Sequence, residues 1–126
     1  MEFRDTRPIY MQIADYFCEN ILLKNWTGDE KIPSVREIAV MLEVNPNTAM
    51  RAFNYMQEND IIYNKRGIGY FVSKEGARKA RELKKKAFIN EELPVFFKTM
   101  ELLGLTCREM EKIYLENYNG KGKDIN

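Results

Sequence analysis

The sequence contains no histidine among its 126 residues and only two cysteines, Cys18 and Cys107. The absence of histidine removes the most common general base and the most common metal ligand. The two cysteines lie far apart, and neither has a CxxC partner, which favours two ordinary thiols over a disulfide framework or a zinc site. We therefore expect the protein to hold no metal ion and no cofactor.

Motifs that carry catalysis are also missing. The chain has no glycine-rich phosphate loop, no nucleophile elbow and no close cluster of acidic residues. A small enzyme would need a paired nucleophile and base, and the sequence offers no such pair. The length of 126 residues is short for a two-domain enzyme but sufficient for one compact core with a small appendage. The sequence therefore favours a protein that is not an enzyme.

Long apolar runs are absent as well. No stretch approaches the roughly 20 apolar residues that a membrane-spanning helix needs. The first five residues, Met1-Glu2-Phe3-Arg4-Asp5, lack the apolar run of a signal peptide. We expect a cytoplasmic protein without a membrane partner.

The net charge gives little guidance about partners. The chain has 20 basic and 19 acidic residues, so the total argues neither for nor against a polyanion. Residues 1–73 carry 8 basic and 10 acidic side chains, whereas residues 74–88 carry 7 and 2. A charge run on a helix is more often a solvated face than a binding surface. The functional interpretation must therefore come from the pattern of residues.

The first part of the pattern predicts three helices. A helix over about 8–24 begins near Pro8 and repeats apolar residues at intervals of four: Ile9, Ile13, Phe17 and Ile21. The Ser34-Val35-Arg36-Glu37 sequence is a capping box and predicts a short helix that ends near Leu42. Asn45-Pro46 supplies an N-cap and a favoured first helical residue for a third helix.

The third helix has two different faces. Its inward stripe is predicted to be Ala49, Ala52, Phe53 and Met56. Its outward side chains are Asn47, Thr48, Arg51 and Asn54. Because only Glu43 and Val44 separate it from the preceding helix, the pair forms a helix-turn-helix whose second helix can enter a major groove.

A β-hairpin is predicted directly after these helices. Residues 61–63 and 70–72 are β-branched or aromatic, and they flank a basic, glycine-containing tip at 64–69. The short segment Lys31-Ile32-Pro33 can add one extended rung to the hairpin. A hairpin that follows a helix-turn-helix is a wing.

The remaining residues predict a helical C-terminal segment. A helix of about 30 residues can run from 73 to Leu103, with a kink or break at Pro94 because proline lacks a backbone donor. A second capping box at 106–109 starts a last helix, and the tail at 119–126 should be frayed. The predicted fold class is mostly α with a small β-hairpin (α+β). A winged helix-turn-helix occupies 1–73 and a two-helix dimerisation segment occupies 74–126.

Four blocks of this sequence together resemble the DNA-binding domain of the GntR family of bacterial regulators. The blocks are Pro8-Ile9-Tyr10-Met11-Gln12-Ile13-Ala14, Lys31-Ile32-Pro33-Ser34-Val35-Arg36-Glu37-Ile38-Ala39, Val44-Asn45-Pro46-Asn47-Thr48 and Arg66-Gly67-Ile68-Gly69-Tyr70-Phe71-Val72. The resemblance covers roughly residues 6–73. The length and helical pattern of the remainder resemble the YtrA subfamily. Asp60 departs from the family by standing where glycine is usual, a change that a left-handed aspartate can accommodate.

The resemblance implies that the third helix docks in the major groove of operator DNA and that the wing tip docks in the minor groove. Carried over by position, the predicted DNA-binding residues are Arg36, Asn45, Asn47, Thr48, Arg51, Arg66 and Gly67, and we add Lys65 from the basic tip. Asn47 and Arg51 are four positions apart and share a helix face that suits paired hydrogen bonds to base edges. Asn45 can alternatively be explained by capping alone, and the others by solvation.

The C-terminal helices are predicted to assemble a homodimer, as the resemblance also implies. The dimerisation residues are Leu93, Phe96, Phe97, Met100, Leu103, Ile113 and Tyr114. They can alternatively close a small local core, although two helices alone bury little. The predicted function is a repressor that binds an inverted-repeat operator, with a possible small-molecule effector that the sequence does not identify. The alternative is a winged-helix module that binds protein without specific DNA binding.

Overall fold

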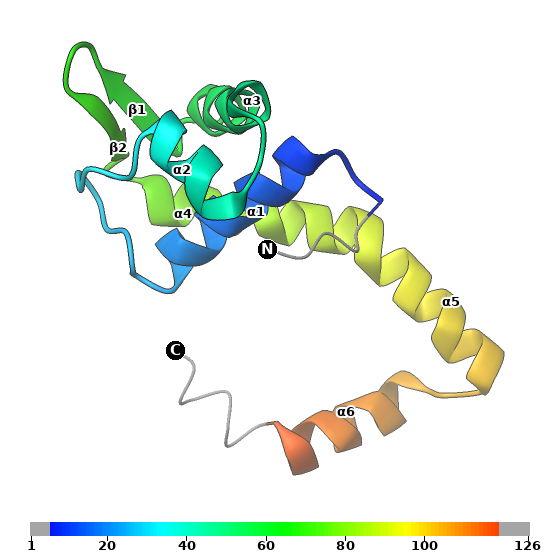
Figure 1. Ribbon diagram of the computed structural model, residues 1–126. Helices are drawn as coiled ribbons and strands as arrows, with labels where there is room; N and C mark the ends of the chain where they lie inside the picture. The colour runs from blue at the N-terminus through cyan, green and yellow to red at the C-terminus, as the bar shows by residue number, and fades with distance from the viewer. Residues whose placement is uncertain (1–5, 119–126) are drawn as a thin grey trace. The chain divides into compact units, whose positions relative to one another are not determined.

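The computed structural model describes residues 6–118. The described residues form two compact units, one ending at Lys86 and the other beginning at Ala87. The first unit contains α1 (Ile9–Leu22), α2 (Val35–Leu42), α3 (Pro46–Glu58), β1 (Ile62–Lys65), β2 (Gly69–Val72) and nearly all of α4 (Gly76–Ala87), as Figure 1 shows. The second contains a π-helical segment η1 (Phe88–Glu92), α5 (Leu93–Leu103) and α6 (Cys107–Asn117). The predicted α+β class with a winged helix-turn-helix is confirmed.

The start of α2 shows how the sequence fixes a helix boundary. The Ser34 hydroxyl accepts a hydrogen bond from the Glu37 N–H at 3.1 Å, and the Glu37 carboxylate accepts one from the Ser34 N–H at 2.9 Å. These bonds satisfy two backbone donors, and the one that the Ser34 N–H gives to the carboxylate lowers the pKa of Glu37. The predicted capping box is therefore confirmed. At the other end of α2, Glu43 adopts the left-handed conformation with φ of 55°.

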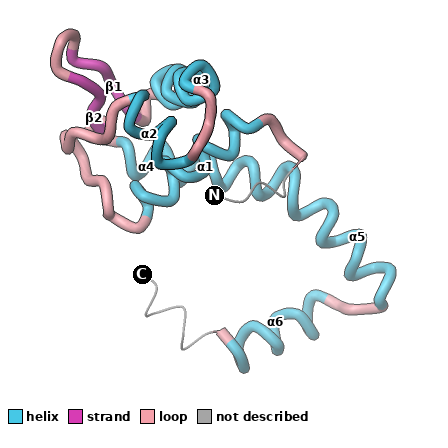
Figure 2. The backbone as a smooth tube through the Cα atoms, viewed as in Figure 1, coloured by secondary structure: helices cyan, strands magenta, loops and turns pink. Residues whose placement is uncertain are grey.

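Only a short loop separates α2 from α3, and Figure 2 shows it in pink. Asn45 caps α3, Pro46 is its first residue, and the chain leaves it through Asp60, which has φ of 57°. The predicted left-handed aspartate is thus present. This arrangement is the helix-turn-helix that the sequence predicts.

The hairpin is antiparallel, with Ile62 opposite Val72 and Lys65 opposite Gly69. The strands reach further toward the tip than the sequence indicates, so only residues 66–68 form the loop. Lys31 pairs with Phe71 as an isolated antiparallel bridge, which confirms the predicted rung from the segment before α2.

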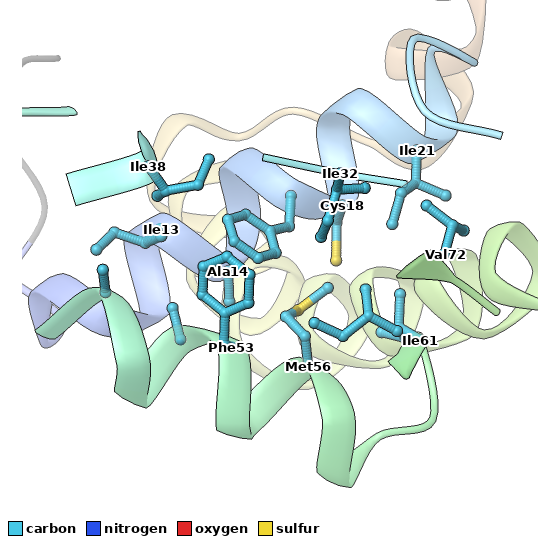
Figure 3. Close-up of a cluster of buried hydrophobic side chains, with 14 of the residues drawn as sticks. Ile13, Ala14, Cys18, Ile21, Ile32, Ile38, Phe53, Met56, Ile61 and Val72 are labelled. Atoms are coloured by element: carbon cyan, nitrogen blue, oxygen red, sulfur yellow. The ribbon is translucent and has the colours of Figure 1, made fainter. Parts of the chain in front are cut away.

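The core of the first unit is shown in Figure 3. Its fully buried residues come from α1, α2, α3 and the hairpin, and include Ile13, Phe17, Ile38, Phe53 and Met56. The Phe17 and Phe53 rings meet edge to face with their centroids 4.9 Å apart. Ile9 is the exception in the first predicted stripe, since it is exposed at the start of α1.

Gly76 allows α4 to begin against the base of the hairpin. A Cβ at this position would lie 2.6 Å from Val72 Cγ1 and 2.9 Å from the Ile61 carbonyl oxygen. A carbonyl cannot move away as a flexible side chain can, so only glycine fits. One turn later, Ala80 is fully buried and completes the core.

The second unit shows what happens around Pro94. Instead of one uninterrupted α-helix to Leu103, the chain forms the π segment η1, in which the Leu93 N–H donates to the Phe88 carbonyl. Proline lacks the donor of a regular helix and its ring crowds the carbonyl four residues earlier, so the hydrogen-bond pattern changes just before it. The chain is not broken at Pro94, since it stays helical from Gly76 to Leu103, and the irregularity lies just before the proline, at Phe88–Glu92.

The last helix begins as predicted. Gly104 ends α5 with φ of 72°, and Thr106 and Glu109 form the second capping box at the start of α6. The predicted frayed tail at 119–126 lies outside the described residues. None of the helices described between residues 6 and 118 is both long and apolar enough to cross a bilayer.

Candidate nucleic-acid interface

The front of α3 is built by its cap. The Asn45 side-chain oxygen accepts a hydrogen bond from the Asn47 N–H at 2.7 Å. This bond engages the Asn45 oxygen and leaves its amide NH2 group out of the cap. Capping thus accounts for the side-chain oxygen of Asn45 and not for its NH2 group. The Asn47 side chain, two residues later, is exposed.

The body of α3 has the two faces that the sequence predicts. Ala49, Ala52 and Phe53 are fully buried, whereas Asn47 and Arg51 are exposed and Thr48 is half-buried. Because α3 packs against both α1 and α2 through its apolar stripe, its polar stripe stays open to solvent. A helix surface of this kind can present amides and a guanidinium to the base edges of a duplex.

Arg51 has a partner that sequence analysis missed. Its Cζ lies 4.3 Å from the centroid of the Tyr10 ring, a cation–π contact between α3 and the start of α1. Tyr10 and Arg51 are 41 positions apart in the printed sequence, and no periodicity links them. Only the packing of α1 on α3 brings the two side chains together.

Arg36 occupies the second position of α2 and is exposed. The capping box holds the start of this helix in place, and α2 packs against α3. The guanidinium is therefore carried by a capped helix that packs next to α3. Figure 1 shows that α2, α3 and the hairpin all belong to the first unit.

The wing tip is a tight turn. The Ile68 N–H donates to the Lys65 carbonyl at 2.9 Å, and Gly67 has φ of 81°. A positive φ at the third residue identifies a type II turn, which favours glycine there. Lys65 lies over the Phe71 ring at 5.0 Å, while Arg66 is exposed at the tip and a Cβ on Gly67 would meet nothing within 4 Å. The tip can therefore approach another surface closely.

Lys31 adds a cation to the wing that sequence analysis did not assign. A Cβ on Gly69 would lie 2.9 Å from Lys31 Cε, so the lysine side chain crosses the hairpin at this glycine. Lys31 is exposed, and its backbone bridge to Phe71 fixes its place. The predicted extended rung was the signal that could have placed this charge on the wing, next to Gly69.

Three of the six basic side chains of α4, Arg78, Lys79 and Lys84, are engaged in ion pairs. Arg78 contacts Glu75 at 2.7 Å and Glu82 at 2.8 Å, and the guanidinium lowers the pKa of Glu75. Lys84 contacts Asp15 at 2.7 Å, and Asp15 also pairs with Arg7. These contacts support a structural role for the paired side chains of this segment.

The residues predicted for dimerisation differ in exposure. Phe96, Phe97, Leu103, Ile113 and Tyr114 are between 41% and 66% exposed. Leu93 is half-buried, and Met100 is only 7% exposed. Met100 lines an open hollow of about 630 Å³ within the second unit, together with side chains that include Phe97, Leu105 and Cys107.

Comparisons with known proteins agree with this geometry. The sequence profile described as "Bacterial regulatory proteins, gntR family" matches residues 9–72. The HTH-type transcriptional regulator YhcF of Bacillus subtilis is 41% identical over 109 residues, which cover 86% of this chain and 88% of the relative. The HTH-type transcriptional repressor YtrA of the same organism is 32% identical, with 88% and 82% covered.

A solved structure gives the same result in three dimensions. A GntR-family regulator from Bacteroides thetaiotaomicron superposes with a TM-score of 0.72 and 45% sequence identity, covering 86% of this chain and 94% of that one. These relatives are transcriptional regulators and not enzymes. The chain therefore belongs to the GntR family of bacterial regulatory proteins and is similar to its YtrA members.

Proposed function

We propose that this protein is a transcriptional repressor that binds an inverted-repeat operator as a homodimer. The observation that carries the proposal is the exposed polar face of α3, where Asn47 and Arg51 stand beside a basic wing. The repressor role is supported by the similarity to YtrA of Bacillus subtilis, which is named a transcriptional repressor. Such a regulator acts in the cytoplasm, where the chromosome is.

In this proposal α3 lies in the major groove and its outward side chains read bases. The Asn47 amide suits an adenine edge and the Arg51 guanidinium suits a guanine edge, because each can make two parallel hydrogen bonds there. Asn45, Thr48 and Arg36 contact the neighbouring backbone and base edges at the front of the helix pair. Discrimination between sequences comes from these contacts.

The wing supplies the second contact. Arg66 and Gly67 enter the minor groove at the tip, where the glycine permits close approach to the sugar-phosphate wall. Lys65 and Lys31 lie further back and contact phosphates. Phosphate contacts give affinity that falls steeply with salt but carry no sequence information.

The second copy is held by the C-terminal residues. Residues 1–73 bind DNA and residues 74–126 dimerise, with the first turns of α4 also completing the core of the first unit through Ala80. The exposed members of the apolar set, Phe96, Phe97, Leu103, Ile113 and Tyr114, pair with the same surface of a partner. A two-fold dimer matches a palindromic site. Any small-molecule effector would act through this second segment.

The test begins with the DNA that the full-length protein retains from a library of genomic fragments. On a duplex recovered in this way, Asn47→Ala or Arg51→Ala should cost about 1–3 kcal/mol, and on a scrambled duplex nearly nothing. Lys31→Ala should weaken binding to both duplexes equally. It should also lower the slope of log affinity against log salt concentration by about 1. Gln57→Ala, an exposed change near the end of α3, is the matched control and should leave both affinities unchanged.

The alternative function predicts a different result. If the wild-type protein binds recovered and scrambled duplexes equally, the specific-repressor proposal is wrong and the protein-interaction module is favoured. If both α3 variants lose the same affinity on both duplexes, the assignment of base reading to Asn47 and Arg51 is wrong.

A further inference from the structure

We propose that Tyr10 is a positioning residue for DNA recognition: its ring holds the Arg51 guanidinium in the orientation that reads a base. The inference rests on the proposed function, because it requires Arg51 to contact DNA. Tyr10 itself is not assigned to contact the duplex. Its contribution is to arrange a side chain of α3 from its own place on α1.

The contact between the two residues is direct. Arg51 Cζ lies over the Tyr10 ring at 4.3 Å from its centroid, well inside the range of about 6 Å for a cation–π interaction. Among the described residues, Arg51 makes no ion pair and no hydrogen bond through its side chain. The ring contact engages none of the guanidinium N–H groups in a hydrogen bond to a described residue, so they are still available for a bidentate contact to guanine.

The Tyr10 ring is itself held in place. Tyr55 follows Arg51 by one helical turn on α3, and its ring meets Tyr10 edge to face, with centroids 6.1 Å apart and planes at 71°. Arg51, Tyr10 and Tyr55 line a common hollow of about 220 Å³ with Asn54 and Glu58. Tyr10 is half-buried, second in α1, and α1 packs on α3. The ring is thus a fixed platform supported by the scaffold.

A fixed platform affects binding through entropy. A free arginine has many rotamers and loses them when it makes a bidentate contact. If Arg51 is already restrained on Tyr10 in the absence of DNA, less freedom is lost on binding. The gain applies only where the guanidinium makes an oriented contact, so it should favour the cognate sequence over other sequences.

The sign of this effect can be tested. If the orientation that Arg51 has over the Tyr10 ring is the one that reads DNA, removing the ring weakens cognate binding. If DNA binding requires Arg51 to leave the ring, removing the ring strengthens cognate binding. The second result would overturn the proposal, and the two outcomes differ in direction and not only in size.

The experiment compares Tyr10→Leu with Tyr10→Phe in the full chain, with fluorescence anisotropy on a duplex recovered by the wild-type protein from genomic fragments and on its scrambled counterpart. Tyr10→Leu should weaken cognate binding about two- to fivefold, the range of an exposed cation–π contact, and leave scrambled binding unchanged. Tyr10→Phe keeps the ring and should retain the wild-type ratio of the two affinities.

A matched control excludes a general effect on α1. Tyr16→Leu changes another half-buried tyrosine of α1, whose ring contacts Trp26 at 6.0 Å and not Arg51. It should leave the affinity ratio unchanged. Thermal unfolding of all three variants reports whether they fold, and a variant is compared only at temperatures where it is folded.

A double-mutant cycle connects the effect to Arg51. Once Arg51→Ala is present, Tyr10→Leu should have no further effect on the ratio of the two affinities. If Arg51→Ala alone leaves cognate binding intact, the base-reading role of Arg51 in the proposed function is wrong. If Arg51→Ala weakens cognate binding but Tyr10→Leu does not, or the two losses simply add, only the positioning role of Tyr10 is wrong.

Discussion

The two compact units of this protein bury their apolar residues to very different extents. In the first unit Ile13, Phe17 and Phe53 are fully buried by their own chain. In the second unit, among residues 87–118, Phe96 is 47%, Phe97 50% and Leu103 66% exposed. Both units are helical with well-formed caps, so the difference lies in packing and not in local structure.

This contrast indicates which unit is complete as a single chain. A fold gains most of its stability from apolar area removed from water, and the first unit achieves this with its own helices and hairpin. The second unit leaves large apolar side chains in solvent, and clusters of this kind mark interfaces. The comparison thus supports the division of work in the proposed function, with DNA binding in one unit and self-association in the other.

The largest effect should come from the buried side of the contrast. Phe53 contacts Phe17 at 4.9 Å and Tyr70 at 4.7 Å between ring centroids, so Phe53→Ala should lower the free energy of unfolding by about 3–5 kcal/mol. Phe97→Ala, at a half-exposed position, should cost far less. Urea unfolding at two protein concentrations measures the free energy of unfolding of both variants. The loss at Phe53 should be the same at both protein concentrations. A loss at Phe97 that is equally large and equally independent of concentration would contradict the comparison.

The next effect concerns association. Leu103→Glu places a charge on the predicted dimer surface and should shift the protein from dimer to monomer in sedimentation velocity at micromolar concentration. Leu102 is 85% exposed and points about 100° away around the same helix, so Leu102→Glu is the matched control and should leave the dimer intact. If Leu102→Glu dissociates the dimer and Leu103→Glu does not, the interface lies on the face of α5 that carries Leu102.

A smaller effect compares the two capping boxes, one in each unit. Ser34→Ala and Thr106→Ala each remove a side-chain acceptor for the N–H three residues later, and each should cost about 1 kcal/mol of helix stability. If the first unit is the cooperative core, Ser34→Ala should lower its melting temperature. Thr106→Ala should instead increase local hydrogen exchange in α6. Identical global effects of both changes would contradict this separation.

The smallest effect is chemical and leaves the fold unchanged. Cys18 is buried and Cys107 is exposed. Burial raises the pKa of the Cys18 thiol from 9.0 to about 12, which disfavours its reactive thiolate. Native protein should therefore react with a thiol reagent at Cys107 only, and at both cysteines after denaturation. Because the folded pKa is the higher one, Cys18 should also lower stability as the pH rises from about 9 toward 12.

Local signals in the sequence were sufficient for most of the fold. Capping boxes, the Asn45-Pro46 start and the paired aromatic strands each depend on residues a few positions apart. The caps lie where they were predicted, and the strands differ from the prediction only at their ends. The π segment was indicated only as an irregularity near Pro94, because the sequence does not specify how a helix accommodates a missing donor. The roles of the predicted DNA-binding and dimerisation residues stay predictions.

Contacts between distant residues account for what was missed in the candidate site. The Tyr10–Arg51 contact and the path of Lys31 across Gly69 depend on how α1 packs on α3 and how the rung joins the hairpin. The burial of Met100 in the second unit likewise depends on packing with its neighbours, and its helix position alone did not reveal it.

The close approach at Gly76 has a mechanical consequence. With no room for even one carbon between the start of α4 and the base of the hairpin, α4 cannot slide without displacing Val72 and the Ile61 carbonyl. The start of α4 and the base of the wing are therefore held in one fixed register, which a side chain at position 76 would disturb.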